Sequence, residues 1–137
     1  LVDSGSFGGG AARNALYRND GAGRFEAVTE AEGLGGAPYG LGDAVGDHDG
    51  DGDGDVCLAG VGGNRLFRND PQGFTDVTEA AGVGGREDAW TTSAGGFDAD
   101  GDGALDLCVG RDVRSPPLRR HLSRARVGDS HSIVSFL

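Results

Sequence analysis

The chain contains no lysine, only two cysteines and no long hydrophobic run. With a formal net charge of −10, it has no basic footprint for a nucleic-acid backbone. No apolar stretch approaches the roughly 20 residues of a membrane-spanning helix. Because the sequence begins at Leu1 rather than Met, the lack of a recognisable signal peptide is no evidence for the cytoplasm. The sequence therefore predicts neither nucleic-acid binding nor a membrane span.

Large apolar residues are also scarce. Leu, Ile, Val and Phe together make up 29 of the 137 residues, whereas 28 residues are glycine. A share of about one fifth is close to the level at which strongly charged chains stay disordered. We therefore expect bound metal to contribute to the stability of the fold.

The two cysteines, Cys57 and Cys108, each stand two residues beyond the last Asp of an acidic segment. A disulfide needs Cα atoms within about 7 Å of each other, which equivalent positions in successive repeats need not meet. Two isolated cysteines also lack the ligand spacing of a zinc site. We expect both to be small apolar residues buried in equivalent strands.

The two acidic segments share one pattern. Residues 47–55 read DHDGDGDGD and residues 98–106 read DADGDGALD, with Asp at relative positions 1, 3, 5 and 9 and Gly at position 6. Carboxylates this close repel one another unless a cation lies between them. Calcium takes six to eight oxygen ligands, and a tight loop with a Gly at its sharp turn can wrap them around one ion. Magnesium is less suited, because it keeps several waters and demands near-octahedral geometry.

The alternative for either segment is a solvated acidic loop, but two copies of one pattern 51 residues apart favour metal binding. Positions 1, 3, 5 and 9 would supply side-chain oxygens. Position 7 would supply its backbone carbonyl, so that Ala is acceptable there. The sequence thus predicts about two calcium ions, one per loop. The predicted ligands are Asp47, Asp49, Asp51, Asp53 and Asp55 in the first loop, and Asp98, Asp100, Asp102, Ala104 and Asp106 in the second.

An EF-hand does not fit these loops. The EF-hand loop needs a bidentate Glu at position 12 and a following helix. Here position 12 is Leu58 or Val109, each inside a short apolar run of the kind typical of buried strands. Each loop is therefore expected to join two strands.

The rest of the chain repeats as well. NALYRND at 14–20 returns as NRLFRND at 64–70, and FEAVTEAEGLGG at 25–36 returns as FTDVTEAAGVGG at 74–85. One full repeat is predicted to contain four short strands and then a single helical turn with Thr78 as its N-cap. The predicted strands are residues 41–46, 55–61, 65–69 and 74–77. Four strands in about 50 residues match a β-propeller blade, so the predicted fold class is all-β, with propeller-type blades of four antiparallel strands.

This pattern divides the chain into four parts. Residues 1–36 are predicted to be the C-terminal part of a preceding blade, 37–90 a complete blade and 91–112 the start of a following blade. Residues 113–137 break the pattern and are expected to be an atypical, disordered basic tail. A propeller typically needs four to eight blades, so the chain is expected to be an incomplete fragment of a propeller.

The strings AVGDHDGDGDGDVCLAG and AGGFDADGDGALDLCVG resemble the FG-GAP/VCBS repeat, the blade of integrin α-subunit-like propellers. NRLFRND and FTDVTEAAGV are similar to the cartilage-acidic-protein/UnbV-type subgroup. The resemblance implies a β-propeller with calcium in the same ten loop positions. It also implies a secreted, periplasmic or cell-surface protein with a role in adhesion or protein interaction.

Nothing in the sequence predicts an enzyme. It offers no His beside a nucleophile and an orienting acid, and calcium keeps its carboxylate ligands ionised, which makes them poor general acids. His48, between two ligand positions, is expected to point to solvent. Arg18 and Arg68 are expected to pair with acidic residues of a neighbouring strand, with ligand binding as the alternative.

The predicted function is that of a calcium-binding FG-GAP/VCBS repeat module with structural and protein-interaction or adhesion roles and no catalysis. The alternative is an accessory module, with carbohydrate binding as one role, of a larger secreted enzyme. The expected partners are calcium and either another protein or an extracellular glycan.

Overall fold

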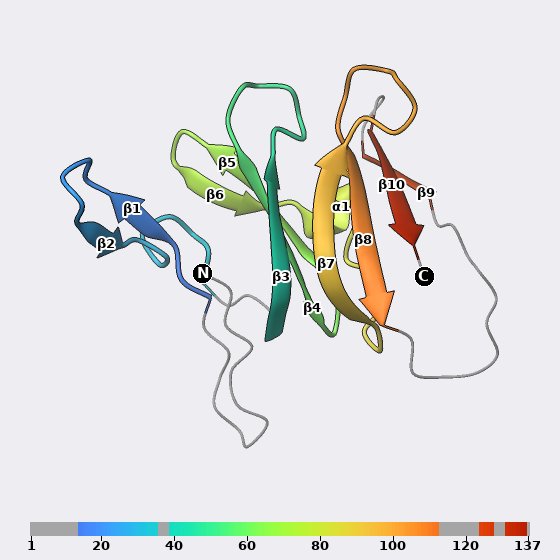
Figure 1. The fold of residues 1–137 in the computed structure, drawn as a ribbon, viewed down its shortest axis with the longest axis horizontal. Coiled ribbons are helices and arrows are strands. Elements are labelled where there is room, and N and C mark those ends of the chain that lie inside the picture. Colours follow the sequence, from blue (N-terminus) through green and yellow to red (C-terminus); the bar gives the residue numbers. More distant parts are fainter. Residues whose placement is uncertain (1–13, 36–38, 113–123, 128–130, 137) are drawn as a thin grey trace.

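A computed structural model describes residues 14–35, 39–112, 124–127 and 131–136, and this part of the chain is almost entirely β-structure (Figure 1). Residues 1–13 and 36–38, at the edges of the first two predicted units, lie outside it. The elements in chain order are β1 (Tyr17–Asn19), β2 (Phe25–Ala27), β3 (Tyr39–Gly46), β4 (Asp55–Val61), β5 (Arg65–Asp70), β6 (Gly73–Asp76), α1 (Thr78–Ala81), β7 (Trp90–Phe97), β8 (Asp106–Asp112), β9 (Arg124–Val127) and β10 (His131–Phe136).

Strands β3 to β6 follow one another as an antiparallel sheet, which we call the central unit together with α1. The four strands predicted for a full repeat are present, with bounds within two residues of those predicted. β4 is buried along most of its length, as expected for the apolar run that follows the acidic loop. The all-β fold with antiparallel blades is confirmed, and the described strands do not close into a barrel.

A two-stranded hairpin equivalent to half of the central unit lies on either side of it in the chain. The hairpin β1–β2 corresponds to β5–β6, and the two share one register, since Asn19 lies opposite Phe25 as Asn69 lies opposite Phe74. The hairpin β7–β8 corresponds to β3–β4, and both carry a register shift at the equivalent point near the start of the first strand. The sequence repeat is therefore a structural repeat. We call residues 14–35, which contain the hairpin β1–β2, the first unit, and the hairpin β7–β8 the third unit.

The hydrogen bonds at the hairpin ends repeat too. Leu16 N–H donates to Thr29 Oγ1 at 2.9 Å, and Leu66 N–H donates to Thr78 Oγ1 at the same distance. The prediction of Thr78 as N-cap is wrong, because Val77 is the N-cap residue and makes no side-chain cap. The Thr78 hydroxyl instead satisfies the N–H of β5, a tertiary demand that outweighs capping.

The atypical tail contains two strands where the sequence predicted no regular structure. β10 pairs in parallel with β8, and β9 pairs antiparallel with β10. β10 lies on the edge of β8 that corresponds to the edge of β4 occupied by β5. An unpaired strand edge presents free N–H and C=O groups and accepts a strand of almost any sequence. The remaining tail residues, 113–123, 128–130 and 137, lie outside the described part.

Two apolar clusters hold neighbouring units together. The first cluster joins the first unit to the central unit and comprises the buried Leu34, Leu58 and Phe67 with Leu16, Val56 and Phe74 packed against them. The second cluster joins the central unit to the third and comprises the buried Cys57, Leu66, Ala81 and Val83 with Ala44, Val77, Ala94 and Leu107. Each unit thus buries its apolar face against the next one, as repeat architectures do.

Strands β3 and β7 approach closely in this packing. A Cβ atom at Gly42 would lie 2.8 Å from the carbonyl oxygen of Thr92, which is closer than real Cβ contacts. Glycine at this position therefore lets the first strands of two successive units run side by side (Figure 1). The two acidic loops, which follow these strands, consequently emerge at the same end of the molecule.

The second cluster yields a stability prediction. Leu66→Ala removes a side chain that is 95% buried, and we expect the free energy of unfolding to fall by about 2–5 kcal/mol. Urea denaturation followed by circular dichroism measures this change. The matched control is Val45→Ala, at a side chain that is 67% exposed, with an expected change within about 0.5 kcal/mol. Equal losses in the two variants would contradict the assigned core.

Candidate metal centre

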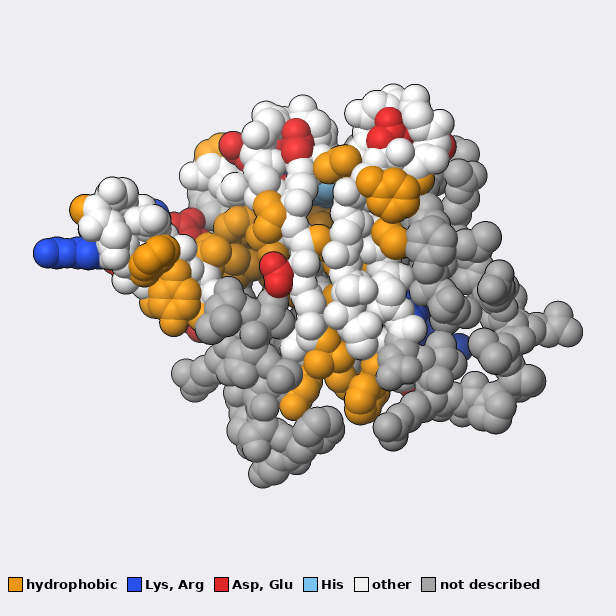
Figure 2. All heavy atoms as spheres, viewed as in Figure 1, with side chains coloured by type: hydrophobic (Ala, Val, Ile, Leu, Met, Phe, Trp, Pro, Cys, Tyr) orange, Lys and Arg blue, Asp and Glu red, His pale blue; other side chains and the backbone are white. Residues whose placement is uncertain are grey.

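Each acidic loop connects the first two strands of a unit, the first between β3 and β4 and the second between β7 and β8. Figure 2 shows acidic side chains on both loops at one end of the molecule. The two loops are separate from each other along this end (Figure 1). Each loop is therefore a separate candidate metal centre.

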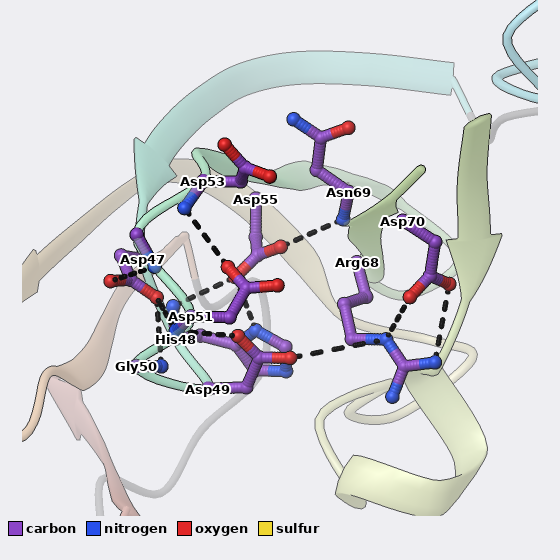
Figure 3. A network of polar contacts seen from close by, with 11 residues as sticks. Asp47, His48, Asp49, Gly50, Asp51, Asp53, Asp55, Arg68, Asn69 and Asp70 are labelled. Atoms are coloured by element: carbon purple, nitrogen blue, oxygen red, sulfur yellow. Dashed lines mark hydrogen bonds and ion pairs between the residues drawn. The ribbon is translucent and has the colours of Figure 1, made fainter. Parts of the chain in front are cut away.

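The first Asp of the first loop is held by the loop's own backbone (Figure 3). Asp47 Oδ1 accepts hydrogen bonds from the N–H groups of Gly50 at 2.8 Å and Asp51 at 3.1 Å. Asp47 Oδ2 accepts from Gly52 N–H at 3.0 Å. Three N–H donors on one carboxylate fix its position in the loop.

The second loop repeats this arrangement almost atom for atom. Asp98 accepts from Gly101 N–H at 2.7 Å, Asp102 N–H at 3.2 Å and Gly103 N–H at 3.0 Å. The hydrogen bond from Gly103, followed by those from the other loop N–H groups, lowers the pKa of Asp98, against a smaller opposing effect of burial. The same geometry from two different sequences shows that the Asp and Gly spacing determines the loop.

Glycine at position 6 serves the backbone. Gly52 has φ +97° and Gly103 has φ +88°, a left-handed conformation that other residues rarely adopt. A Cβ at either position would meet no atom within 4 Å. The requirement for Gly is therefore conformational rather than steric, as the sequence pattern implied.

The Asp at position 9 anchors each loop to its sheet. Asp55 is 2% exposed; its Oδ2 accepts from His48 N–H at 2.7 Å and its Oδ1 from Asn69 N–H of β5 at 2.8 Å (Figure 3). Asp106 is 3% exposed, and its Oδ2 accepts from Ala99 N–H at 2.8 Å. A buried carboxylate requires such donors, since an unpaired buried charge is costly. In the central unit, the third strand thus contributes directly to the loop.

The prediction that His48 points to solvent is wrong. Its side chain is only 17% exposed, and its Nδ1 atom lies 2.5 Å from Asp55 Oδ2. The buried Asp55 carboxylate draws the imidazole inward, whereas the second loop has Ala99 at this position, and its backbone N–H donates to Asp106. The sequence does contain a signal for this pair: a His directly follows the first Asp of the loop, and an Asp stands at the start of the next strand.

The structure brings several of the predicted ligand side chains together. One carboxylate oxygen from each of Asp47, Asp49 and Asp51 lies within 4.8 Å of the others in the first loop, and the same holds for Asp98, Asp100 and Asp106 in the second. Two oxygens bound to one calcium ion at 2.3–2.6 Å are at most about 5 Å apart. Each cluster is therefore compact enough to hold a metal ion.

The two loops differ in how position 9 joins these clusters. Asp106 belongs to the carboxylate group of the second loop. Asp55 instead groups with His48 and Asp49, again within 4.8 Å. Asp53 and Asp102 belong to none of these three groups. The full ligand set of ten residues, with its two backbone carbonyls, stays a prediction.

The repeated arginines behave differently from each other. Arg18 forms the expected ion pair with the neighbouring strand, through Glu26 of β2 at 3.2 Å. Arg68 instead binds both carboxylate oxygens of Asp70 in its own strand, and its Nε atom lies 3.9 Å from Asp49 Oδ2 (Figure 3). For Arg68 the expected cross-strand pair is wrong, because the adjacent acidic residue offers a bidentate partner. The positive charge of Arg68 therefore lies beside the carboxylate group of the first loop.

The cysteines play no part in either centre. Cys57 is buried and Cys108 is half-buried, and both are free thiols. Burial raises the pKa of Cys57 to about 12 and raises that of Cys108 as well. Neither is therefore an appreciable thiolate, the form that binds metals and attacks electrophiles, at neutral pH.

Among the described residues, no helix is long and apolar enough to cross a membrane.

The second loop yields a pH prediction for the calcium-free protein. A folded-state pKa below the unfolded value stabilises the fold above the unfolded pKa, and this stabilisation is lost as the pH falls through the folded pKa. We expect the Asp98 carboxyl to titrate below its ordinary pKa of 3.8. Carbon-detected NMR titration in the presence of chelator measures this pKa. The Asp98→Asn variant identifies the carboxyl resonance of Asp98. A midpoint at or above the value in the unfolded chain would contradict the hydrogen-bonded geometry.

Comparison with known proteins agrees with the resemblance noted in the sequence. Residues 47–109 match the family model of the FG-GAP-like repeat. No curated protein and no solved structure matches the chain. The matched segment begins at the first Asp of the first loop and ends in β8, so it contains both acidic loops and the four strands and the helix between them. Residues 47–109 of this protein are therefore an FG-GAP-like repeat.

Proposed function

We propose that this protein is a calcium-binding repeat module with a structural and protein-interaction role and without catalysis. The observation that carries the proposal is the grouping of three carboxylates within 4.8 Å in each of two loops. Repetition matters here, since one exposed acidic group is common without a metal. The proposed ligands are Asp47, Asp49, Asp51, Asp53 and Asp55 for one ion, and Asp98, Asp100, Asp102, Ala104 and Asp106 for the other.

Calcium would act on the fold through the hairpins. Carboxylates at these separations repel one another, and a divalent cation converts that repulsion into attraction. The first loop links β3 to β4, and Asp55 links it further to β5 through Asn69 N–H. An ion in this loop would therefore stabilise three strands of the central unit at once. The described residues contain only two modest apolar clusters. Stabilisation by an ion would therefore be a substantial part of the stability of the fold.

The setting we propose is outside the cytoplasm, in a secreted, periplasmic or cell-surface protein. FG-GAP-like repeats occur in extracellular and surface proteins and mediate protein interaction. Extracellular calcium modules work with dissociation constants of about 10⁻⁴–10⁻³ M, because calcium is abundant there. The proposed partner is another protein or an extracellular glycan, in adhesion or assembly. An accessory role beside an enzyme would use the same module.

A thermal melt tests the structural role of the ions. We expect calcium to raise the melting temperature of the β-sheet relative to chelator, because an ion that binds only the folded state stabilises it. At a hundredfold excess over the dissociation constant, each site contributes about 2.7 kcal/mol. Circular dichroism measures the melt, with magnesium at the same concentration as the control and a smaller effect expected. Identical melting curves with calcium and with chelator would refute the proposal.

A calorimetric titration tests the ligand assignment. Asp98→Asn combined with Asp100→Asn is expected to reduce calcium binding from two equivalents to one, because amides cannot replace two carboxylates at the second loop. The control combines Glu87→Gln with Asp88→Asn, which removes the same charge from two exposed residues outside the loops. The control protein should still bind two ions. Two equivalents in both variants would show that the second loop is not a site.

A further inference from the structure

The first and third units are complementary halves of the central unit. The central unit has four strands, β3 to β6. The third unit supplies the counterparts of the first two, and the first unit supplies the counterparts of the last two. One hairpin of each kind would together make a complete four-stranded unit.

The first unit exposes side chains that the central unit buries. Tyr17 stands at the position of Phe67 and is 49% exposed, whereas Phe67 is 3% exposed. Phe25 stands at the position of Phe74 and is 66% exposed, whereas Phe74 is half-buried. Figure 2 shows hydrophobic side chains on the surface of this hairpin, which projects from one side of the molecule. Two exposed aromatic side chains at neighbouring positions favour an interaction surface over isolated exposure.

The hairpin also has an unpaired edge. Among the described residues, β1 pairs only with β2. The corresponding edge of β5 pairs with β4, with Phe67 opposite Val56 and Leu66 opposite Cys57. Applied to the repeat, this register places Tyr17 opposite Leu107 and Leu16 opposite Cys108. The partner strand that fits this edge is therefore β8.

The second apolar cluster lacks the aromatic side chains that the first cluster contains. In the first cluster, Phe67 and Phe74 pack with Leu16 and Leu34 of the preceding unit. The second cluster contains the counterparts of these leucines, Leu66 and Val83, and the counterpart of Val56, Leu107. Among the described residues it contains no aromatic side chain. A hairpin docked on β8 would bring Tyr17 and Phe25 to the second apolar cluster.

We propose that the β1–β2 hairpin of one copy of this chain docks on β8 of a second copy, as the third and fourth strands of a composite unit. The interface is head-to-tail, since each copy offers a different surface at each side. Such interfaces form closed rings where the rotation closes and filaments where it does not. The proposal goes beyond the metal-binding function and rests on strand pairing, not on the ions.

Strand β10 competes for the same edge. It pairs with β8 in parallel from Leu107 to Gly110, the stretch that the hairpin would use. A parallel ladder is slightly less stable per residue than an antiparallel one, and the hairpin matches the repeat pattern whereas the tail does not. Self-association therefore requires displacement of β10. The net charge of −10 also opposes it, so moderate salt favours the complex.

Sedimentation velocity of the full chain, over a range of protein concentrations with calcium and moderate salt, tests the proposal. We expect concentration-dependent association. Tyr17→Lys should weaken it about tenfold or more, because a charge replaces a buried aromatic side chain at the interface. The matched control is Phe97→Lys, which places the same charge at a side chain that is 44% exposed and outside the proposed interface. Equal weakening by both variants, or none by Tyr17→Lys, overturns the proposal.

Three further substitutions test the register and the competition. Leu16→Cys should form a disulfide with the native Cys108 of another copy and so give covalently linked oligomers, and adding Cys108→Ser should abolish this link. Val134→Pro removes a backbone N–H from the β10 ladder opposite Cys108 and should strengthen association. A chain that stays monomeric at every concentration, with and without Val134→Pro, overturns the proposal. So does a cross-link that persists in Cys108→Ser.

Discussion

The packing of one unit's apolar face against the next is the interaction on which the rest of the structure depends. No single unit has enough large apolar side chains to form its own core, and the two clusters are each built from neighbouring units. This packing needs β3 and β7 to run side by side, which Gly42 permits at its contact with Thr92. The placement of both acidic loops at one end follows from it. The position of the two candidate metal centres is therefore a consequence of the repeat packing as well as of their own sequence.

Electrostatics then ties each loop back to the sheet. Asp55 and Asp106 are buried carboxylates at the start of the second strand of their units, and each accepts a backbone N–H from its loop. In the central unit, Asn69 of the third strand donates to the same Asp55 side chain. Loop, hairpin and third strand thus share one charged group. A cation in the loop and the pairing of the third strand would each strengthen the other, because both hold the same carboxylate in place.

The sequence predicted best what is determined locally. The Asp and Gly spacing predicted loops between strands, and the strand 55–61 was predicted with its bounds, because both depend on a few adjacent residues. The inward turn of His48, the bidentate pairing of Arg68 with Asp70 and the hydroxyl of Thr78 as acceptor for β5 were not foreseen. Each depends on a partner brought near only by the fold. The strand β10 was missed for another reason, since an open edge recruits a strand through backbone groups that no side-chain pattern reveals.

The repeat register connects the proposed docking to the second loop. In the central unit, Asn69 donates to Asp55 and Arg68 borders Asp49. The first unit carries Asn19 and Arg18 at these two positions, and Arg18 is 61% exposed in its present ion pair. A hairpin docked on β8 would bring Asn19 toward Asp106 and Arg18 toward Asp100. A positive side chain and an N–H donor beside an acidic loop lower the repulsion among its carboxylates. Docking and ion binding at the second loop would then be thermodynamically linked, and Arg18, being positive like calcium, would by itself weaken binding of the ion there.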